Sequence, residues 1–330
     1  MARGKRIPVE DIDLDSVSDV SELLRQQVAA GGFTGRHLGE AADILERMSR
    51  RKGCRTFLAF PAAIMATGLR GVVRTLIARG LFDVVVTTCG SLDHDLARTW
   101  GTYYHGHWDL DDAKLRQRGL NRLGNVIVPD SSYGVLLERR LQPLLRSWYR
   151  AGMRTLSSAE LCQRLGEAID DEVSLLHVAA RRGTTIVVPG ITDGAVGSQL
   201  WLFRQTHRDF SIDVLADEEI LAGKVFGTRW SGALIIGGGI SKHHTIWWNQ
   251  FKAGLDYTVY MSTGMEHDGS LTGARVKEAI SWGKVKARSH STHVDGEATA
   301  LLPYLAWGVL QRLDADPPQR YHPARRSRAP

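Results

Sequence analysis

The hydrophobic positions of this chain follow two alternating periods, which predict strands separated by helices. Apolar residues at helical spacing predict an amphipathic helix over about Gly35–Arg50. A strand signal over Arg55–Phe60 then meets Pro61, and the apolar positions beyond it trace a helix that Gly80 closes. The chain is therefore expected to begin with a helix, a strand and a second helix.

The same alternation continues toward the carboxyl terminus. The strand predicted over Asp83–Thr88 is apolar throughout its centre, as expected of a strand buried on both faces of a parallel sheet. It leads into a polar segment, Cys89–Asp95, which is predicted to be a loop. Helical patterns separate the remaining strand signals, which are Val126–Val128, Thr185–Val188, Ala233–Ile236 and Tyr257–Met261. Two of those helices are a long one over about Tyr133–Arg150 and one opened by the capping-box pattern Ser157-x-x-Glu160.

Six parallel strands with intervening helices predict an α/β fold. The expected architecture is a doubly wound, mostly parallel sheet with helices on both faces, forming a single large Rossmann-like domain. In such sheets ligands bind beyond the carboxyl ends of the strands. We expect this domain to cover residues 9–313, after a basic amino-terminal segment, 1–8. The last residues, 314–330, are rich in proline and arginine with almost nothing apolar, and this composition predicts disorder.

Length, charge and cysteine content narrow the class of protein. With 330 residues and 43% hydrophobic content the chain can bury a large core. Its formal charge is +6, but seven positive charges lie in the two ends, and residues 7–316 carry −1. This near-neutral body does not favour nucleic acid as a partner. The chain has no membrane-spanning apolar run and no secretory leader, and its three widely spaced cysteines suit neither a disulfide framework nor a zinc site, so a cytoplasmic protein is expected.

Three consecutive glycines, Gly237 to Gly239, directly follow a predicted buried strand. Glycines in this place let backbone amides approach a phosphate group, and a helix expected to begin near His244 would add its positive end. The spacing lacks the third glycine of the dinucleotide-binding fingerprint. A dinucleotide site and a simple turn therefore both remain open from this motif.

Lys284 is a candidate nucleophile because it follows Trp282 and Gly283. An indole on one side and a missing side chain on the other would leave the ammonium poorly hydrated, which lowers the pKa of a lysine and favours imine formation. Glu278 stands four residues before Trp282, so a helix would place a carboxylate and a π surface on one face, a combination that suits an amine. The alternative is a solvated lysine, an exposed Glu278 and a tryptophan packed in the core.

Further polar candidates lie in the predicted loops and beside the glycines. Asp193 and Asp268 each follow a predicted strand, where they could hold ribose hydroxyls or an amine, or form Asx turns. One of His243 and His244 could shuttle a proton. Adjacent histidines point in divergent directions and no ligand stands at metal spacing, so no metal is expected.

Three blocks in order carry a family resemblance: I-G-G-G-I-S-K-H-H, H-D-G-S and S-W-G-K. Together they resemble the deoxyhypusine synthase family, over roughly Val9 to Leu313, and the loop G-S-L-D-H-D is similar to its archaeal members. Members of this family use NAD to transfer an aminobutyl group from spermidine, a polyamine, to a lysine of the translation initiation factor 5A precursor. The resemblance implies the same substrates and cofactor here, and a homotetramer with active sites between subunits.

The resemblance also implies roles for single residues. Lys284 would carry the aminobutyl imine, with His243 and Glu278 as the other catalytic residues. The amine pocket would comprise His243, Glu278, Trp282, Ser198, Leu271 and Tyr260. The NAD site would comprise Thr88, Cys89, Asp193, Gly238, Gly239, Thr263, Asp268, Glu297 and Ala298.

Some positions depart from the family pattern. Ser198 and Leu271 stand where well-known members carry amine-binding aspartates, and neither can pair with an ammonium group. The donor could therefore be another amine such as agmatine, or the acceptor a small amine, as in homospermidine-synthase-like relatives. Ala63 and Ala66 stand where asparagine and serine are familiar in the NAD site. A non-catalytic, NAD-binding paralogue is the alternative from another class.

Overall fold

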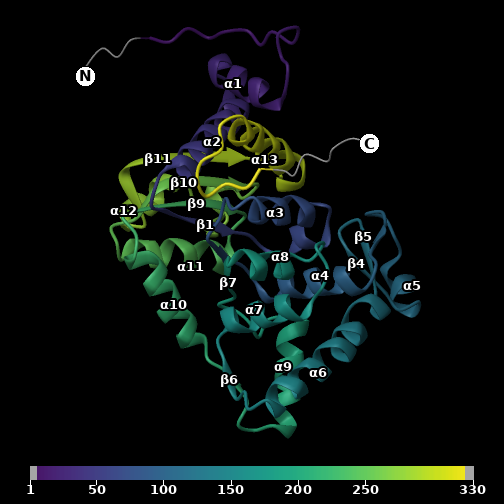
Figure 1. The fold of residues 1–330 in the computed structure, drawn as a ribbon. Helices are drawn as coiled ribbons and strands as arrows, with labels where there is room; N and C mark the ends of the chain where they lie inside the picture. Colours follow the sequence, from purple (N-terminus) through teal and green to yellow (C-terminus); the bar gives the residue numbers. More distant parts are fainter. Residues whose placement is uncertain (1–5, 324–330) are drawn as a thin grey trace, which may run out of the picture.

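The computed structural model describes residues 6–323, and its centre is a six-stranded parallel sheet (Figure 1). In spatial order the strands are β11 (Val285–Asp295), β10 (Leu255–Ser262), β9 (Trp230–Ile236), β1 (Cys54–Ala59), β2 (Val84–Val86) and β7 (Thr185–Val187). Numbered along the chain this order is 6-5-4-1-2-3, which is the Rossmann order. The predicted fold class is therefore confirmed.

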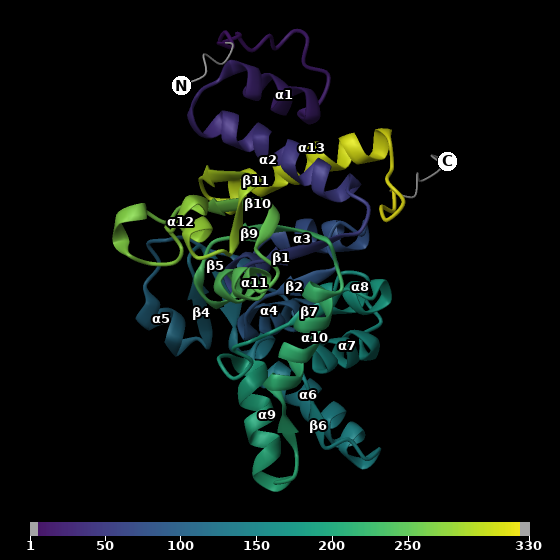
Figure 2. The same cartoon turned by 90° about the vertical axis from the view of Figure 1, so that its left-hand side faces the viewer.

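Helices cover both faces of this sheet (Figure 2). One face packs against α2 (Phe33–Arg50), α3 (Leu69–Ala78), α4 (Cys89–Trp100), α8 (Leu175–Arg182) and α13 (Ala298–Ala315), with α1 (Val20–Ala30) on α2 and α13. The other face packs against α10 (Val214–Phe226), α11 (Gly239–Gln250) and α12 (Val276–Ser281), whereas α7 (Ser158–Ala168) contributes residues to both cores. Strands such as β10, in which every residue is buried, are apolar because both faces are covered.

One predicted strand belongs to a different sheet. Val126–Val128 lies in β5 (Val126–Pro129), which pairs antiparallel with β3 (Tyr104–His105) and β4 (Leu120–Leu123) beside α5 (Asp112–Gln117). The sixth strand of the central sheet is β11, which the hydrophobic pattern did not predict. This strand lies at the edge of the sheet, and only three of its residues, Val285, Thr292 and Val294, are buried, so it has no continuous apolar run.

The remaining elements form the lower part of the molecule in Figure 1 and the short connections. They are α6 (Gly134–Arg150), α9 (Ala195–Thr206), the paired strands β6 (Thr155–Leu156) and β8 (Ser211–Ile212), and the short 3-10 helices η1 (Ala62–Ala66), η2 (Asp130–Ser132) and η3 (Glu266–Asp268). The predicted capping box is present, with Ser157 and Glu160 bonded reciprocally at the start of α7. No helix within residues 6–323 has the length and apolar composition that a membrane crossing requires.

The polar segment Cys89–Asp95 is not a loop, because it forms the first turns of α4. Its two aspartates point inward and accept hydrogen bonds from the starts of other helices. Asp93 accepts from two backbone N–H groups at the start of α9, at 2.7 and 2.8 Å. Asp95 accepts from two at the start of α8, at 2.9 and 3.0 Å, and pairs with Arg70. The polarity of this segment therefore reflects buried helix caps.

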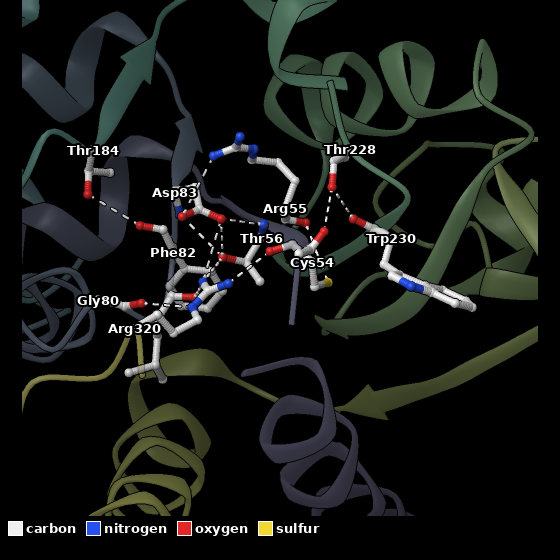
Figure 3. Close-up of polar contacts among 12 residues, drawn as sticks. Cys54, Arg55, Thr56, Gly80, Phe82, Asp83, Thr184, Thr228, Trp230 and Arg320 are labelled. Carbon is white, nitrogen blue, oxygen red and sulfur yellow. Dashed lines mark hydrogen bonds and ion pairs between the residues drawn. The ribbon is translucent and has the colours of Figure 1, made fainter. Parts of the chain in front are cut away.

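The carboxyl-terminal segment differs from the predicted disorder up to the last described residue, Pro323. Tyr321 is buried, and Arg320 reaches the amino ends of β1 and β2 (Figure 3). The Arg320 guanidinium donates to the backbone oxygens of Cys54 (2.9 Å), Leu81 (2.8 Å) and Gly80 (3.3 Å). Composition alone predicted disorder because it does not reveal that one side chain satisfies three carbonyls. Residues 324–330 of the predicted tail, and 1–5 of the amino-terminal segment, lie outside the described residues.

Candidate active site

The residues expected to bind the cofactor gather at one edge of the sheet. All six strands run in parallel, so the segments that follow them meet at their carboxyl ends. The expected residues follow β2 (Thr88, Cys89), β7 (Asp193), β9 (Gly238, Gly239), β10 (Thr263, Asp268) and β11 (Glu297, Ala298). The strand order reverses between β1 and β9, which is where dinucleotides bind in this architecture.

The triple glycine has a specific geometry at this reversal point. Gly237 and Gly239 have positive φ angles, 69° and 67°, which residues with side chains rarely adopt. A Cβ on Gly238 would lie 2.3 Å from Thr272, whereas one on Gly239 would meet no atom within 4 Å. The helix α11 begins at Gly239 rather than near His244, so its first N–H groups, which have no partner within the helix, lie at the glycine turn.

Thr88 and Cys89 lie beside each other at the end of β2 but differ in character. The Thr88 hydroxyl oxygen is buried without a hydrogen-bond partner, which is costly unless a ligand completes it. The Cys89 thiol is buried near Asp93, and burial raises its pKa to about 12. Cys89 is therefore a neutral wall of the site at physiological pH, and no nucleophile.

Lys284 lies in an aromatic enclosure between α12 and β11. Its side chain belongs to a residue only 8% exposed, and its Nζ lies 5.1 Å from the centre of the Trp282 ring and 5.7 Å from that of Trp247. The same Nζ is 3.5 Å from His243 Nε2. Partial burial, followed by the positive charge of Lys284, lowers the pKa of His243, so the imidazole is neutral and can accept a proton from the amine.

One face of α11 beside Lys284 is apolar and exposed. It carries Ile240, His243, Trp247 and Phe251 at spacings of three and four residues, with Trp247 41% and Phe251 50% exposed. Trp282, adjacent to this face, is 65% exposed rather than packed in the core. A contiguous exposed apolar surface around a buried amine is typical of an interaction site.

Contrary to the sequence prediction, Glu278 and Trp282 do not both lie within one helix. The helix α12 ends at Ser281, so Trp282 is its cap instead of its last turn, and Glu278 is exposed. Among the described residues, no hydrogen bond or ion pair connects Glu278 with Lys284. Its charge acts instead on Lys242 and Tyr260.

Lys242 is a buried residue of this region that the sequence did not single out as a site residue. Its Nζ donates to the backbone oxygens of Leu271 (2.7 Å) and Ala274 (2.8 Å) and lies 4.1 Å from the Tyr260 ring centre. Burial lowers the pKa of Lys242 to about 8. The ammonium thus fixes the segment between β10 and α12, which contains Asp268. A lysine on the buried side of an amphipathic helix was the available signal.

The other expected pocket residues do not all converge in one chain. Tyr260 is fully buried on β10, and its hydroxyl has no partner. Leu271 contributes its carbonyl to Lys242. Ser198 is exposed on α9 and donates to the Gly194 oxygen. Ser198 follows β7, whereas Lys284 precedes β11. These two strands are the outermost strands on opposite sides of the six-stranded sheet.

The paired histidines diverge as expected. His243 faces Lys284, whereas His244 Nε2 lies 3.2 Å from the Glu218 carboxylate. Within residues 6–323, His, Cys, Asp and Glu side chains form no group of three that could hold a metal ion.

The Rossmann strand order, with helices on both faces of the sheet, places this chain in the class of doubly wound α/β proteins. Comparison with protein families matches residues 22–309 to the model described as deoxyhypusine synthase. The chain belongs to the deoxyhypusine synthase family, whose members are transferases.

Relatives and a solved structure agree with this assignment. The "Probable deoxyhypusine synthase" of Thermoplasma volcanium is 47% identical over 298 residues, which are 90% of this chain and 96% of the relative. That of Picrophilus torridus is 46% identical over 304 residues, 92% of this chain and 97% of the relative. The crystal structure of an Entamoeba histolytica protein assigned as a deoxyhypusine synthase superposes with a TM-score of 0.61 at 19% identity, covering 91% of this chain and 96% of that one. This last similarity concerns the fold.

Proposed function

We propose that this protein transfers an aminobutyl group from spermidine to a lysine of the translation initiation factor 5A precursor, with NAD as cofactor and Lys284 as covalent carrier. The observation that carries the proposal is the environment of the Lys284 amine. It is nearly buried, lies between two indoles and is 3.5 Å from a neutral imidazole. These surroundings hold the amine in place beside a base that can take its proton when it adds to an imine.

The proposed reaction uses Lys284 as the nucleophile and His243 as the base. Hydride acceptance and return are what NAD supplies when bound. Once the donor amine is oxidised to an imine, the Lys284 amine adds to the imine carbon and 1,3-diaminopropane leaves, so that the four-carbon fragment is held as an imine on Lys284. His243 accepts the proton that Lys284 loses. The acceptor lysine displaces Lys284 in the same way, and reduction of the new imine completes a cycle without net oxidation.

Three features at the carboxyl ends of the strands support a dinucleotide there. The partnerless Thr88 hydroxyl can bond a ligand oxygen or hydroxyl. The open space at Gly239 admits a phosphate group to the first N–H groups of α11. Asp193 and Glu297 follow the two outermost strands of the sheet, where their carboxylates suit ribose hydroxyls.

We also propose that the complete site needs a second subunit, as in a homotetramer with sites between subunits. Ser198 and Lys284 belong to opposite edges of a six-stranded sheet, and five strand spacings of about 4.8 Å separate such edges by roughly 24 Å. One small amine cannot contact both in one chain. The exposed face of α11 and Trp282 supplies an apolar surface that a neighbouring subunit can cover.

Ser198 and Leu271 favour a second candidate for the donor. Neither side chain supplies a negative charge, so a donor other than spermidine, such as agmatine, or a small-amine acceptor follows from the same site. A non-catalytic paralogue is the remaining alternative, and the enclosed Lys284 argues against it.

Borohydride trapping of the Lys284 imine tests the proposal. Labelled spermidine with NAD should leave reducible label on Lys284, and adding the factor 5A precursor should move the label to that protein. The Lys284→Arg variant keeps the charge but cannot form the imine, so transfer should fall by at least about 1,000-fold. Lys277→Arg, on the exposed face of α12, is the matched control. Absence of an adduct with every polyamine would contradict the proposal, whereas label appearing on a small amine would identify the alternative acceptor.

A further inference from the structure

A basic hollow opens at the amino ends of β1 and β9, on the edge of the sheet opposite to the glycine turn. Its volume is about 570 Å³. Four cationic residues, one indole and one carboxylate dominate its wall: Arg51, Lys52, Arg55, Arg229, Trp230 and Asp83. Figure 3 shows Arg55 and Asp83 at this edge, with Trp230 on the far side of Cys54. No residue of the proposed transferase site lines it.

The positive charges of the hollow are largely uncompensated. Asp83 is shared between Arg55, at 3.9 Å, and Arg320, at 3.5 Å. Among the described residues, Arg51, Lys52 and Arg229 form no ion pair. All three side chains are exposed on the wall of the hollow. Clustering like charges costs folding free energy, and a bound anion would recover that cost.

The guanidinium groups are held in place yet keep free donors. Arg51 lies over the Trp230 indole at 4.0 Å from the ring centre, and Arg229 lies 5.4 Å from it. Neither guanidinium donates a hydrogen bond within the described residues. On the same wall, the Arg55 Nε is a buried donor without an acceptor. The Arg51 and Arg229 guanidinium groups therefore keep N–H donors for an anion in the hollow.

The walls of the hollow are also fixed. Thr228 donates to the Gly53 oxygen at 2.6 Å and so connects the segments that precede β9 and β1. Burial raises the pKa of the Cys54 thiol to about 12, which keeps it neutral and unreactive beside the arginines. The hollow can therefore hold a ligand by charge and hydrogen bonding, without covalent chemistry.

We propose that this hollow binds a polyphosphate anion, either free pyrophosphate or the polyphosphate group of a nucleotide. Guanidinium groups match phosphate oxygens in pairs, and several unpaired cations match more than one phosphate charge. The volume is larger than one phosphate needs. The site lies on the edge of the sheet opposite to the proposed NAD crevice, and it does not depend on the transferase proposal.

Isothermal titration of the full chain at constant ionic strength tests this assignment. Sodium pyrophosphate and ATP should each bind at one site per chain, and inorganic phosphate more weakly. Arg51→Gln and Arg229→Gln should each raise the pyrophosphate Kd by at least about tenfold, because each removes charge-assisted hydrogen bonds. Arg139→Gln, an equal charge change on exposed α6, should leave it unchanged.

Several results would overturn the assignment. These are no pyrophosphate binding to the wild type, equal loss in the Arg139→Gln control, and ATP binding that NAD displaces and both pocket variants retain. Binding of a single-stranded oligonucleotide without pyrophosphate binding would show a nucleic-acid surface instead. Arg51→Lys, which keeps the charge, should restore part of the affinity. Circular dichroism and label transfer by Lys284 should be unchanged in the variants, which separates this site from failure of folding or of the proposed function.

Discussion

The carboxyl ends and the amino ends of the central strands differ in how far the protein itself satisfies their hydrogen-bonding groups. At the carboxyl edge, glycine turns and helix starts leave open space, and a buried hydroxyl of Thr88 lacks a partner. At the amino edge, Arg320 satisfies three backbone carbonyls with a single side chain. The carboxyl ends of the strands thus keep polar groups without partners in the protein alone. The amino ends are covered by the carboxyl-terminal segment, except at the basic hollow.

This contrast separates stability from ligand binding. Unsatisfied donors and open turns cost folding free energy and are retained where a ligand completes them. The closed edge contributes stability without contacting the candidate active site. Substitutions at the two edges should therefore have different consequences, which three predictions examine.

Arg320→Ala should have the largest effect and act on stability alone. It leaves the carbonyls of Cys54, Gly80 and Leu81 without their shared donor, so the free energy of unfolding should fall by about 3 kcal/mol in urea titration. The control variant Gln319→Ala, at the exposed neighbouring residue, should leave the free energy of unfolding unchanged. Label transfer by the folded fraction of Arg320→Ala should be normal, and a loss of transfer at unchanged stability would break the contrast between the edges.

Lys242 should give a pH-dependent contribution at the carboxyl edge. Its folded pKa of about 8 lies below the unfolded value, so between about pH 8 and pH 10.4 the unfolded chain binds more protons and stability should rise with pH. Below pH 8 both states are protonated and the contribution is constant. Across this pH range, the free energy of unfolding in urea should rise for the wild type but not for Lys242→Met. Parallel curves would show that the amine titrates normally.

Thr88→Val should have the smallest effect and distinguish ligand binding from folding. The buried hydroxyl has no partner in the protein, so replacing it by a methyl group should leave the free energy of unfolding unchanged or raise it by up to about 1 kcal/mol. NAD affinity, measured by titration, should nevertheless fall by about five- to tenfold if that oxygen bonds the cofactor. Thr67→Val, whose hydroxyl is already bonded to the Ile64 oxygen, should show the opposite pattern.

Local patterns in the sequence predicted those parts of the fold whose causes are local. The strands β1, β9 and β10 contain short runs of apolar residues, and α7 has its own capping box, so these elements are recognisable from the sequence. The edge strand β11 is not, because half of it faces solvent. The polar start of α4 was taken for a loop, since nothing in the sequence shows that its aspartates cap α8 and α9 across the fold.

The sequence proposes residues for the candidate site but not their arrangement in space. Short motifs identified Lys284, His243 and the glycine turn, and the structure brings the first two within 3.5 Å. Spacing along the chain could not show that Ser198 lies beyond the opposite strand, or that Trp282 is exposed in one chain. These facts depend on strand order and on surfaces between chains. The roles of the individual residues stay predictions.

The buried carboxylate of Asp93 makes the turn before α9 part of a mechanical linkage. It grips the first amides of α9 and the hydroxyl of Tyr133, which precedes α6, while its own helix starts at Cys89. A single carboxylate therefore fixes the starts of α6 and α9 to the end of β2. Removing it would leave both helix starts without their shared acceptor.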